Sequence, residues 1–213
     1  MGNATDWVAN KIAEGNDLEL IERPAPDRLI VRASGKDAFQ VAVIGVRGVI
    51  TIDHVAPVFQ GADLPYFVLN IPSNTVWRGD AMEAIHDAPA AFGSLGDLGK
   101  AARLEYPYLY RDKQWSFFDQ GISQHSNVKN VKHLYDRVFE AHRYNGDPLI
   151  IAMVDAYNMS AEDVRGALSR YEKFDVAVKM TTYGSITSAA SQAAASFGAE
   201  ALMYGDLLRR LGK

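Results

Sequence analysis

The last third of the sequence alternates short apolar segments with helical segments, and this alternation constrains the fold more than any other feature. A chain that alternates strands with helices builds a sheet whose strands run mainly parallel, with the helices packed on its faces. The sequence therefore predicts an α/β fold in this region. The expected strands are 148–154, 175–181 and 200–204, and the expected helices are 160–171, 185–195 and 206–211.

Composition restricts the chemistry that this fold can carry. The 213 residues include no cysteine, which excludes disulfides, thiolate metal sites and cysteine nucleophiles. The net charge of −4 argues against a generally basic coat for nucleic acid but allows a local basic patch. No apolar run approaches the roughly 20 residues that cross a bilayer, and the N-terminus has no apolar signal segment. We therefore expect a soluble cytoplasmic protein with no membrane partner.

The rest of the chain mixes strands and helices. Apolar spacing predicts a helix at 5–13, strands at 18–21, 29–31, 39–46, 49–52 and 65–71, a broken helical pattern at 79–103, an aromatic hairpin at 106–118 and an amphipathic helix at 128–143. No internal repeat of 20–50 residues is found. The predicted segments are an N-terminal half (1–78), a helical and hairpin insertion in the middle (79–145), and a C-terminal α/β segment (146–213) that either joins the first sheet or forms its own.

Residues 1–45 hold a specific order of elements. A short helix precedes a strand, Pro26-Asp27 precede a second strand, and a buried strand after a polar turn carries Gln40-Val41-Ala42. This order resembles the PDDEXK superfamily, whose restriction-endonuclease-like fold is a mixed sheet flanked by helices. In that family an Asp at the start of one strand and a Glu-x-Lys or Gln-x-Lys on the next converge on a divalent metal that polarises the scissile phosphate.

The resemblance implies two site residues and one defect. Asp27 and Gln40 stand at the positions of the family's metal ligands, so they are the implied catalytic residues, with Mg²⁺ or Mn²⁺ as the cofactor if the site is intact. The family's Lys position is Ala42, which offers neither a charge nor a hydrogen bond. The nearby basic residues that would have to replace this Lys are Lys36, Arg32 and Arg47. The resemblance therefore implies a nuclease-like fold with a degenerate active site and no cofactor.

The C-terminal third resembles the last part of Mrr-type restriction endonucleases. In those proteins a strand ends in Thr-Thr-x-Gly, and an Ala-rich helix leads to a short strand and a closing helix. The corresponding segments here are 178–184, 188–195 and 202–208.

The same residues also have simpler interpretations. Pro26-Asp27 is a common kind of turn before a strand. Gln40 in an apolar strand could equally face solvent or bond a backbone group. Gly184, after Thr181-Thr182, could simply supply a turn with positive φ.

A basic and aromatic region lies in the middle of the chain. Cations neutralise phosphates, and aromatic rings stack on bases. In the alternative interpretation the aromatic residues pack a hairpin against the core and the charges form a solvated face. The candidate nucleic-acid-binding residues are Arg111, Lys113, Trp115, Lys129 and Lys132.

These observations predict a nucleic-acid-associated protein, with DNA as its partner and without strong nuclease activity. The first alternative is a non-enzymatic module of the same fold that binds a protein partner or forms a homodimer, since Tyr, Trp and Arg are enriched at interface hot spots. The second is a small-molecule or nucleotide enzyme with an apolar pocket near the helix that begins at Ser185.

Overall fold

The computed structural model describes residues 4–212 and divides the chain into two compact units, with the division between Asp112 and Lys113. Each unit has its own five-stranded mixed sheet and its own helices, so the α/β class is confirmed. The sequence did not decide whether the N-terminal and C-terminal parts share one sheet, and the structure shows that each forms its own.

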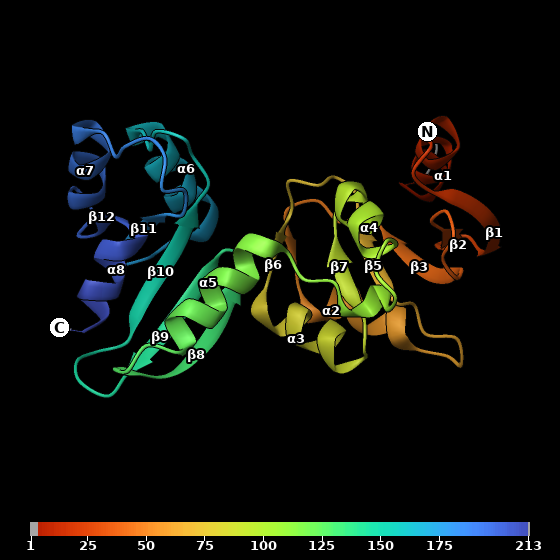
Figure 1. Cartoon of the computed structure of the whole chain (residues 1–213), viewed down its shortest axis with the longest axis horizontal. Coiled ribbons are helices and arrows are strands. Elements are labelled where there is room, and N and C mark those ends of the chain that lie inside the picture. The colour runs from red at the N-terminus through yellow and green to blue at the C-terminus, as the bar shows by residue number, and fades with distance from the viewer. Residues whose placement is uncertain (1–3, 213) are drawn as a thin grey trace. The chain divides into compact units, whose positions relative to one another are not determined.

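The first unit has the strand order β1-β2-β3-β5-β7. The strands β1, β2 and β3 pair antiparallel, and β3, β5 and β7 pair parallel. A short parallel pair, β4 with β6, lies outside this sheet. The elements are α1 (Ala4–Glu14), β1 (Glu19–Ala25), β2 (Arg28–Arg32), β3 (Phe39–Ile44), β4 (Val49–Ile50), α2 (Ile52–Val55), η1 (Ala56–Phe59), β5 (Phe67–Asn70), β6 (Val76–Trp77), α3 (Gly79–Asp87), β7 (Ala91–Gly93), α4 (Leu95–Ala101) and η2 (Pro107–Leu109) (Figure 1).

The second unit has the strand order β12-β11-β10-β9-β8. Here β8, β9 and β10 pair antiparallel, and β10, β11 and β12 pair parallel. Both units therefore follow the same order. A helix comes first, and three antiparallel strands follow it. Two further strands, each preceded by a helix, pair parallel to the third strand, and a last helix closes the unit. The elements are α5 (Lys113–Ser123), β8 (Val128–Tyr135), β9 (Val138–Arg143), β10 (Leu149–Val154), α6 (Ala161–Tyr171), β11 (Val176–Lys179), α7 (Ser188–Ala195), β12 (Glu200–Met203) and α8 (Tyr204–Leu211) (Figure 1).

The first and last helices of each unit pack on one face of its sheet. In the first unit, α1 and α4 bury Val8, Ile12 and Leu98 in one core with the strands. In the second unit, α5 and α8 bury Phe118 and Leu207 in the same way. Burying each of these side chains contributes about 1.5–3 kcal/mol, so each sheet is stabilised by helices from both ends of its own segment.

Two predictions for the middle of the chain are wrong. The expected hairpin at 106–118 is the 3₁₀ turn η2 followed by α5, because Trp115, Phe118 and Ile122 recur at helical spacing and face the second core. The expected helix at 128–143 is the hairpin of β8 and β9. Its apolar residues fit a helical stripe, but the tight turn at Asp136-Arg137 separates two short runs that pair with each other.

The expected insertion at 79–145 is also divided by the structure. Its first part, α3, β7 and α4, completes the first unit, and its last part, α5, β8 and β9, begins the second. Strand pairing across long sequence separations decides this division, and a local hydrophobic pattern carries no information about it.

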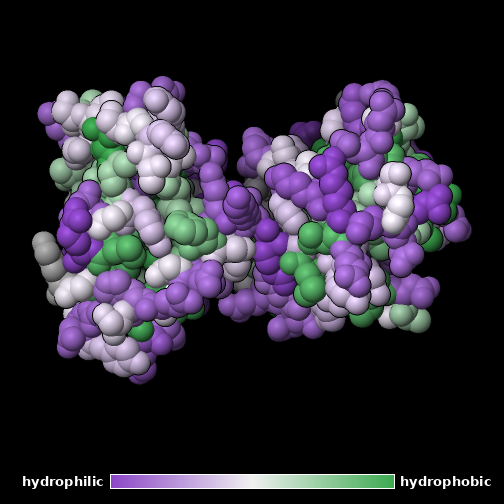
Figure 2. All heavy atoms as spheres, viewed as in Figure 1, coloured by the Kyte–Doolittle hydropathy of each residue, from purple (hydrophilic) through white to green (hydrophobic). Residues whose placement is uncertain are grey.

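The surface of both units is mixed in character. Figure 2 shows hydrophilic side chains beside small hydrophobic patches over the visible face. Among residues 4–212, no helix combines the length and the apolar character needed to cross a membrane.

Candidate active site and nucleic-acid surface

Asp27 lies in the turn that joins β1 to β2, directly before the first residue of β2. Its side chain is 58% exposed, and Oδ2 accepts a hydrogen bond from Nη1 of Arg28 at 3.1 Å. Its main-chain carbonyl accepts a hydrogen bond from the amide of Val43 at 2.8 Å. The turn therefore adjoins the carboxyl end of β3.

Gln40 lies on β3, opposite Ile30 of β2. The side chain is half-buried, and its oxygen Oε1 is buried with no hydrogen-bond partner among the described residues. A buried amide oxygen without a partner destabilises the folded state unless a ligand or water bonds to it. Mg²⁺ is coordinated by oxygens of this kind. This oxygen accepts no hydrogen bond from the described backbone, while the side chain as a whole remains partly exposed to solvent.

Arg28 lies directly opposite Ala42, the position of the missing Lys. Because side chains alternate along a strand, Arg28, Ala42 and Gln40 share one face of the sheet. The Arg28 side chain is only 13% exposed; besides Asp27, its guanidinium donates to the carbonyl of Val58 in η1 at 2.6 Å. A guanidinium stays protonated in proteins, so it can pair with an anion but cannot accept a proton from an attacking water.

The three basic residues considered as replacements for the missing Lys lie at different places in the first unit. Arg32 pairs with Glu19 at 2.7 Å, Lys36 lies in the turn between β2 and β3, and Arg47 lies in the loop after β3. The basic residue that accompanies Asp27 is Arg28, which the sequence analysis did not consider.

A metal ion at this place would find few protein ligands. Within residues 4–212, no three or more His, Asp or Glu side chains are grouped so as to hold a metal ion. Asp27 and Gln40 would supply one carboxylate oxygen and one amide oxygen, and water would have to fill the other positions around Mg²⁺ or Mn²⁺.

The predicted nucleic-acid-binding residues are distributed over both units. Arg111 lies next to the last residue of the first unit and donates from Nη1 to the carbonyls of Tyr108, at 3.0 Å, and Tyr110, at 2.7 Å. Burial lowers the pKa of Arg111 below its ordinary value. Trp115 packs its ring against those of His133, at 4.9 Å between centroids, and Phe139, at 6.1 Å. Arg111 thus supports its own backbone, and Trp115 packs from α5 against the second core.

The three lysines of the predicted set are exposed in the second unit. Lys113 is the first residue of α5, and Lys129 and Lys132 lie on β8, the edge strand of the sheet. Exposed lysines can neutralise phosphates, and on an edge strand they also discourage pairing with another chain.

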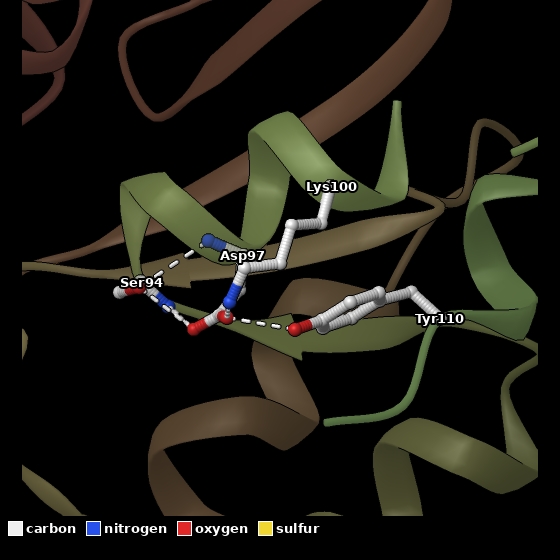
Figure 3. Close-up of polar contacts among 4 residues, drawn as sticks. All are labelled: Ser94, Asp97, Lys100 and Tyr110. Atoms are coloured by element: carbon white, nitrogen blue, oxygen red, sulfur yellow. Dashed lines mark hydrogen bonds and ion pairs between the residues drawn. The ribbon is translucent and has the colours of Figure 1, made fainter. Parts of the chain in front are cut away.

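The polar cluster around Asp97 stabilises α4 rather than forming a reactive site. Asp97 accepts hydrogen bonds from the amide and hydroxyl of Ser94, at 3.1 and 2.7 Å, and from the hydroxyl of Tyr110 at 2.7 Å, while Lys100 lies 3.0 Å away (Figure 3). The side chain of Ser94 in turn accepts the amide of Asp97. This is a capping box that fixes the start of the helix.

Replacing Asp97 with alanine is expected to lower the free energy of unfolding by about 1–3 kcal/mol, because the cap is lost and Tyr110 loses its acceptor. Burial raises the pKa of Asp97, but hydrogen bonds from Ser94, Tyr110 and Lys100 outweigh burial and lower it below its ordinary value. The pKa of Asp97 is therefore lower in the folded chain than in the unfolded chain. The ionised carboxylate stabilises the fold fully above about pH 4, and this contribution is lost as the pH falls further. Urea unfolding between pH 3 and 7 measures it, with exposed Asp63→Ala as the control; equal losses in both variants would contradict it.

A cavity of ≈ 350 Å³ lies in the second unit, at the carboxyl end of β10. No motif in the sequence pointed to it, because its residues come from α5, the β8–β9 turn, β10, α6 and the positions directly after β10 and β11. It is not at the helix that begins near Ser185, where an apolar pocket was considered. The polar residues that line it include Gln114, Arg137, Asp155, Glu162, Arg170 and Tyr171.

Comparison of the chain with protein-family models, with curated proteins and with solved structures finds no match.

Proposed function

We propose that this chain is a nucleic-acid-associated protein whose N-terminal unit has a nuclease-like arrangement that does not hydrolyse phosphodiesters efficiently. The order of a helix and three antiparallel strands, with Asp27 at the start of the second strand and Gln40 on the third, supports the nuclease-like arrangement. The absence of cysteine suits a cytoplasmic location.

The position of Arg28 is the observation that carries the proposed loss of hydrolysis. Its guanidinium bonds Asp27 and lies opposite Ala42, under the carbonyl of Val58. A positive charge already paired with Asp27 competes with a divalent cation for the same carboxylate. Arg28 cannot take a proton from water, because a guanidinium stays protonated in proteins.

We expect no cleavage of duplex or single-stranded DNA in the presence of Mn²⁺ or Mg²⁺. The measurement is electrophoresis of end-labelled oligonucleotides after incubation with the full chain, with Asp27→Ala as the matched control. Background cleavage equal in both proteins agrees with the proposal. Cleavage by the wild type that disappears in Asp27→Ala would show a working metal site and would overturn it.

Association with nucleic acid is tested separately by binding. We expect the double variant Lys129→Ala with Lys132→Ala to bind a DNA duplex more weakly at low salt, and to reduce the slope of log affinity against log salt by about 2, because each phosphate contact contributes about 0.9. Fluorescence anisotropy measures both quantities. Lys173→Ala, an exposed lysine on another segment of the second unit, is the charge control. Wild-type protein that does not bind at low salt would contradict the proposal.

A second candidate function is recognition of a protein partner. Tyr157 and Tyr183 are 70% and 76% exposed and lie on adjoining loops, after β10 and after β11. Tyrosine is enriched at interface hot spots. No DNA binding at low salt, together with an interaction lost on Tyr157→Ala with Tyr183→Ala, would favour this function.

A further inference from the structure

The strand registers of the two units correspond residue by residue. In the first unit the residues aligned across β2, β3, β5 and β7 are Leu29, Val41, Phe67 and Ala91. In the second unit the residues aligned across β9, β10, β11 and β12 are Phe139, Ile151, Val176 and Glu200. Each residue of the first row therefore has a counterpart in the second, and the two sheets share their register as well as their topology.

The sequence repeats at positions matched by this register. Gly96-Asp97-Leu98 in α4 corresponds to Gly205-Asp206-Leu207 in α8, at the same separation as Phe67 from Val176. In each triplet the Asp forms an ion pair with the basic residue three positions later, Lys100 or Arg209. Three alanines repeat at this separation too, in the pairs Ala81 and Ala190, Ala84 and Ala193, and Ala90 and Ala199.

Asn70 in the first unit and Lys179 in the second are buried polar residues at matched positions. Asn70 ends β5 opposite the last residue of β3, and Lys179 ends β11 opposite the last residue of β10. Asn70 donates to the carbonyls of Val46 and Pro72, and Lys179 donates to those of Thr181 and Tyr183. Both side chains therefore tie down the loop that follows their strand. From register, repeated residues and this shared device, we infer that the second unit is a second copy of the fold of the first.

The place of Asp27 is occupied by Arg137 in the second copy. The carbonyl of Asp27 accepts the amide of Val43 at 2.8 Å, and the carbonyl of Arg137 accepts the amide of Met153 at 2.8 Å. Register places Ile150 at the position of Gln40 and Ala152 at that of Ala42. The second copy has thus exchanged both candidate metal ligands for a cation and an apolar side chain.

The cavity of the second unit opens at this same place, and two guanidinium groups line it. Arg137 and Asp163 are half-buried, whereas Arg170, Asp155 and Glu162 are exposed, so solvent screens these three more strongly. The carboxylate of Asp163 is occupied by the amide and hydroxyl of Ser160, at 2.8 and 2.7 Å.

Neutral hydrogen-bond donors complete the lining. Burial and the charge of Asp136 raise the pKa of Tyr171 to about 12, although Arg170 and Arg137 oppose this rise. The phenol therefore keeps its proton at neutral pH. The side-chain amide of Gln114 adds two N–H groups, and Gly166 leaves room beside them.

We propose that this cavity binds a phosphate group without a metal ion, through the guanidinium groups of Arg137 and Arg170. A guanidinium matches the oxygens of a phosphate in a bidentate geometry and supplies the positive charge that a metal would supply in the first unit. The phosphate belongs either to a small ligand or to a nucleic-acid strand, and the site does not depend on whether the first unit associates with nucleic acid.

The test is calorimetric titration of the full chain with inorganic phosphate, with a 5′-phosphorylated dinucleotide and with an oligonucleotide that lacks a terminal phosphate. We expect Arg137→Gln and Arg170→Gln each to weaken phosphate binding at least about tenfold, and Arg165→Gln, an exposed arginine of the same helix outside the cavity lining, to leave it unchanged. Removing a repelling charge with Asp155→Asn or Glu162→Gln is expected to strengthen binding.

The three ligands separate the two sources of the phosphate. Binding of phosphate and of the dinucleotide, but not of the oligonucleotide, assigns a terminal phosphate; binding of all three assigns the nucleic-acid backbone. Thermal melting checks that each variant is folded, and Arg170→Gln, which changes an exposed side chain, keeps the test valid if Arg137→Gln unfolds. No saturable binding of phosphate by the wild type, or binding weakened by Asp155→Asn, would overturn the proposal.

Discussion

Replacing Lys179 with alanine is expected to lower the free energy of unfolding by about 2–5 kcal/mol. Lys179 is fully buried at the end of β11, and its ammonium donates to the carbonyls of Thr181 and Tyr183 and to the hydroxyl of Thr181. Alanine would leave a cavity where the long side chain lies, and it would remove the donors of these acceptors. The loop after β11 would lose its connection to the sheet.

Two further variants separate the causes of this loss. Lys179→Met keeps most of the volume and removes the donors, so we expect it to destabilise less than alanine does. Lys173→Ala removes an exposed lysine and is expected to change stability by no more than about 0.5 kcal/mol. Urea unfolding followed by circular dichroism measures all three. A Lys179→Ala protein as stable as Lys173→Ala would show that the hydrogen bonds of the Lys179 ammonium contribute little to stability.

Replacing Gly184 with alanine is expected to destabilise the second unit by about 2–4 kcal/mol. Gly184 has φ +76°, and a Cβ atom there would lie 1.9 Å from the carbonyl oxygen of Tyr157 and 2.8 Å from Oδ1 of Asn158. The carbonyl belongs to the backbone, so the two loops would have to separate. The hydrogen bond from the amide of Ser185 to Asn158, at 2.9 Å, would be strained by the same movement.

Gly198 provides a matched control for the backbone conformation. It has φ +83°, but a Cβ atom there would meet nothing within 4 Å. Gly198→Ala therefore carries only the cost of an L residue in the left-handed region, about 1–2 kcal/mol. The excess loss in Gly184→Ala measures the steric contact between the loops by thermal or urea unfolding. Equal losses in the two variants would mean that the loops have no such contact in solution.

These two positions bear on the second candidate function. Lys179 and Gly184 hold the loops that carry Tyr157 and Tyr183. A rigid loop loses less conformational entropy on binding, so an interface at these tyrosines would depend on both residues. Variants that loosen the loops should therefore weaken such an interaction even though they leave the tyrosines in place.

The first unit shows how far local patterns predict a fold. The helix at 4–14, the strands β2 and β3, and the turn before Arg28 agree with the sequence prediction, because apolar spacing and turn residues act over a few positions. The segment 106–143 shows where this reasoning fails. Its apolar residues fit both a helix and a pair of short strands, and packing against the second core decided between them.

The candidate site was predictable only in part. The sequence placed Asp27 directly before one strand and Gln40 on the next, and these strands, β2 and β3, pair. It could not show Arg28 opposite Ala42, because cross-strand register is a long-range property. The covering carbonyl of Val58 comes from a segment far along the chain, so no local motif could have revealed it.

The sequence alone determined the α/β class, most of the helices and strands, and the helix start at Ser160, where the hydroxyl and Asp163 form a capping box. These features depend on hydrogen bonds and burial patterns within a few residues. Only the tertiary structure decided that the chain forms two sheets of one register, and that Arg137 takes the place of Asp27 beside a cavity. Both follow from pairing between distant strands, which tolerates almost any side chains that fill the same space, so the two copies could retain their shape while losing most of their sequence similarity.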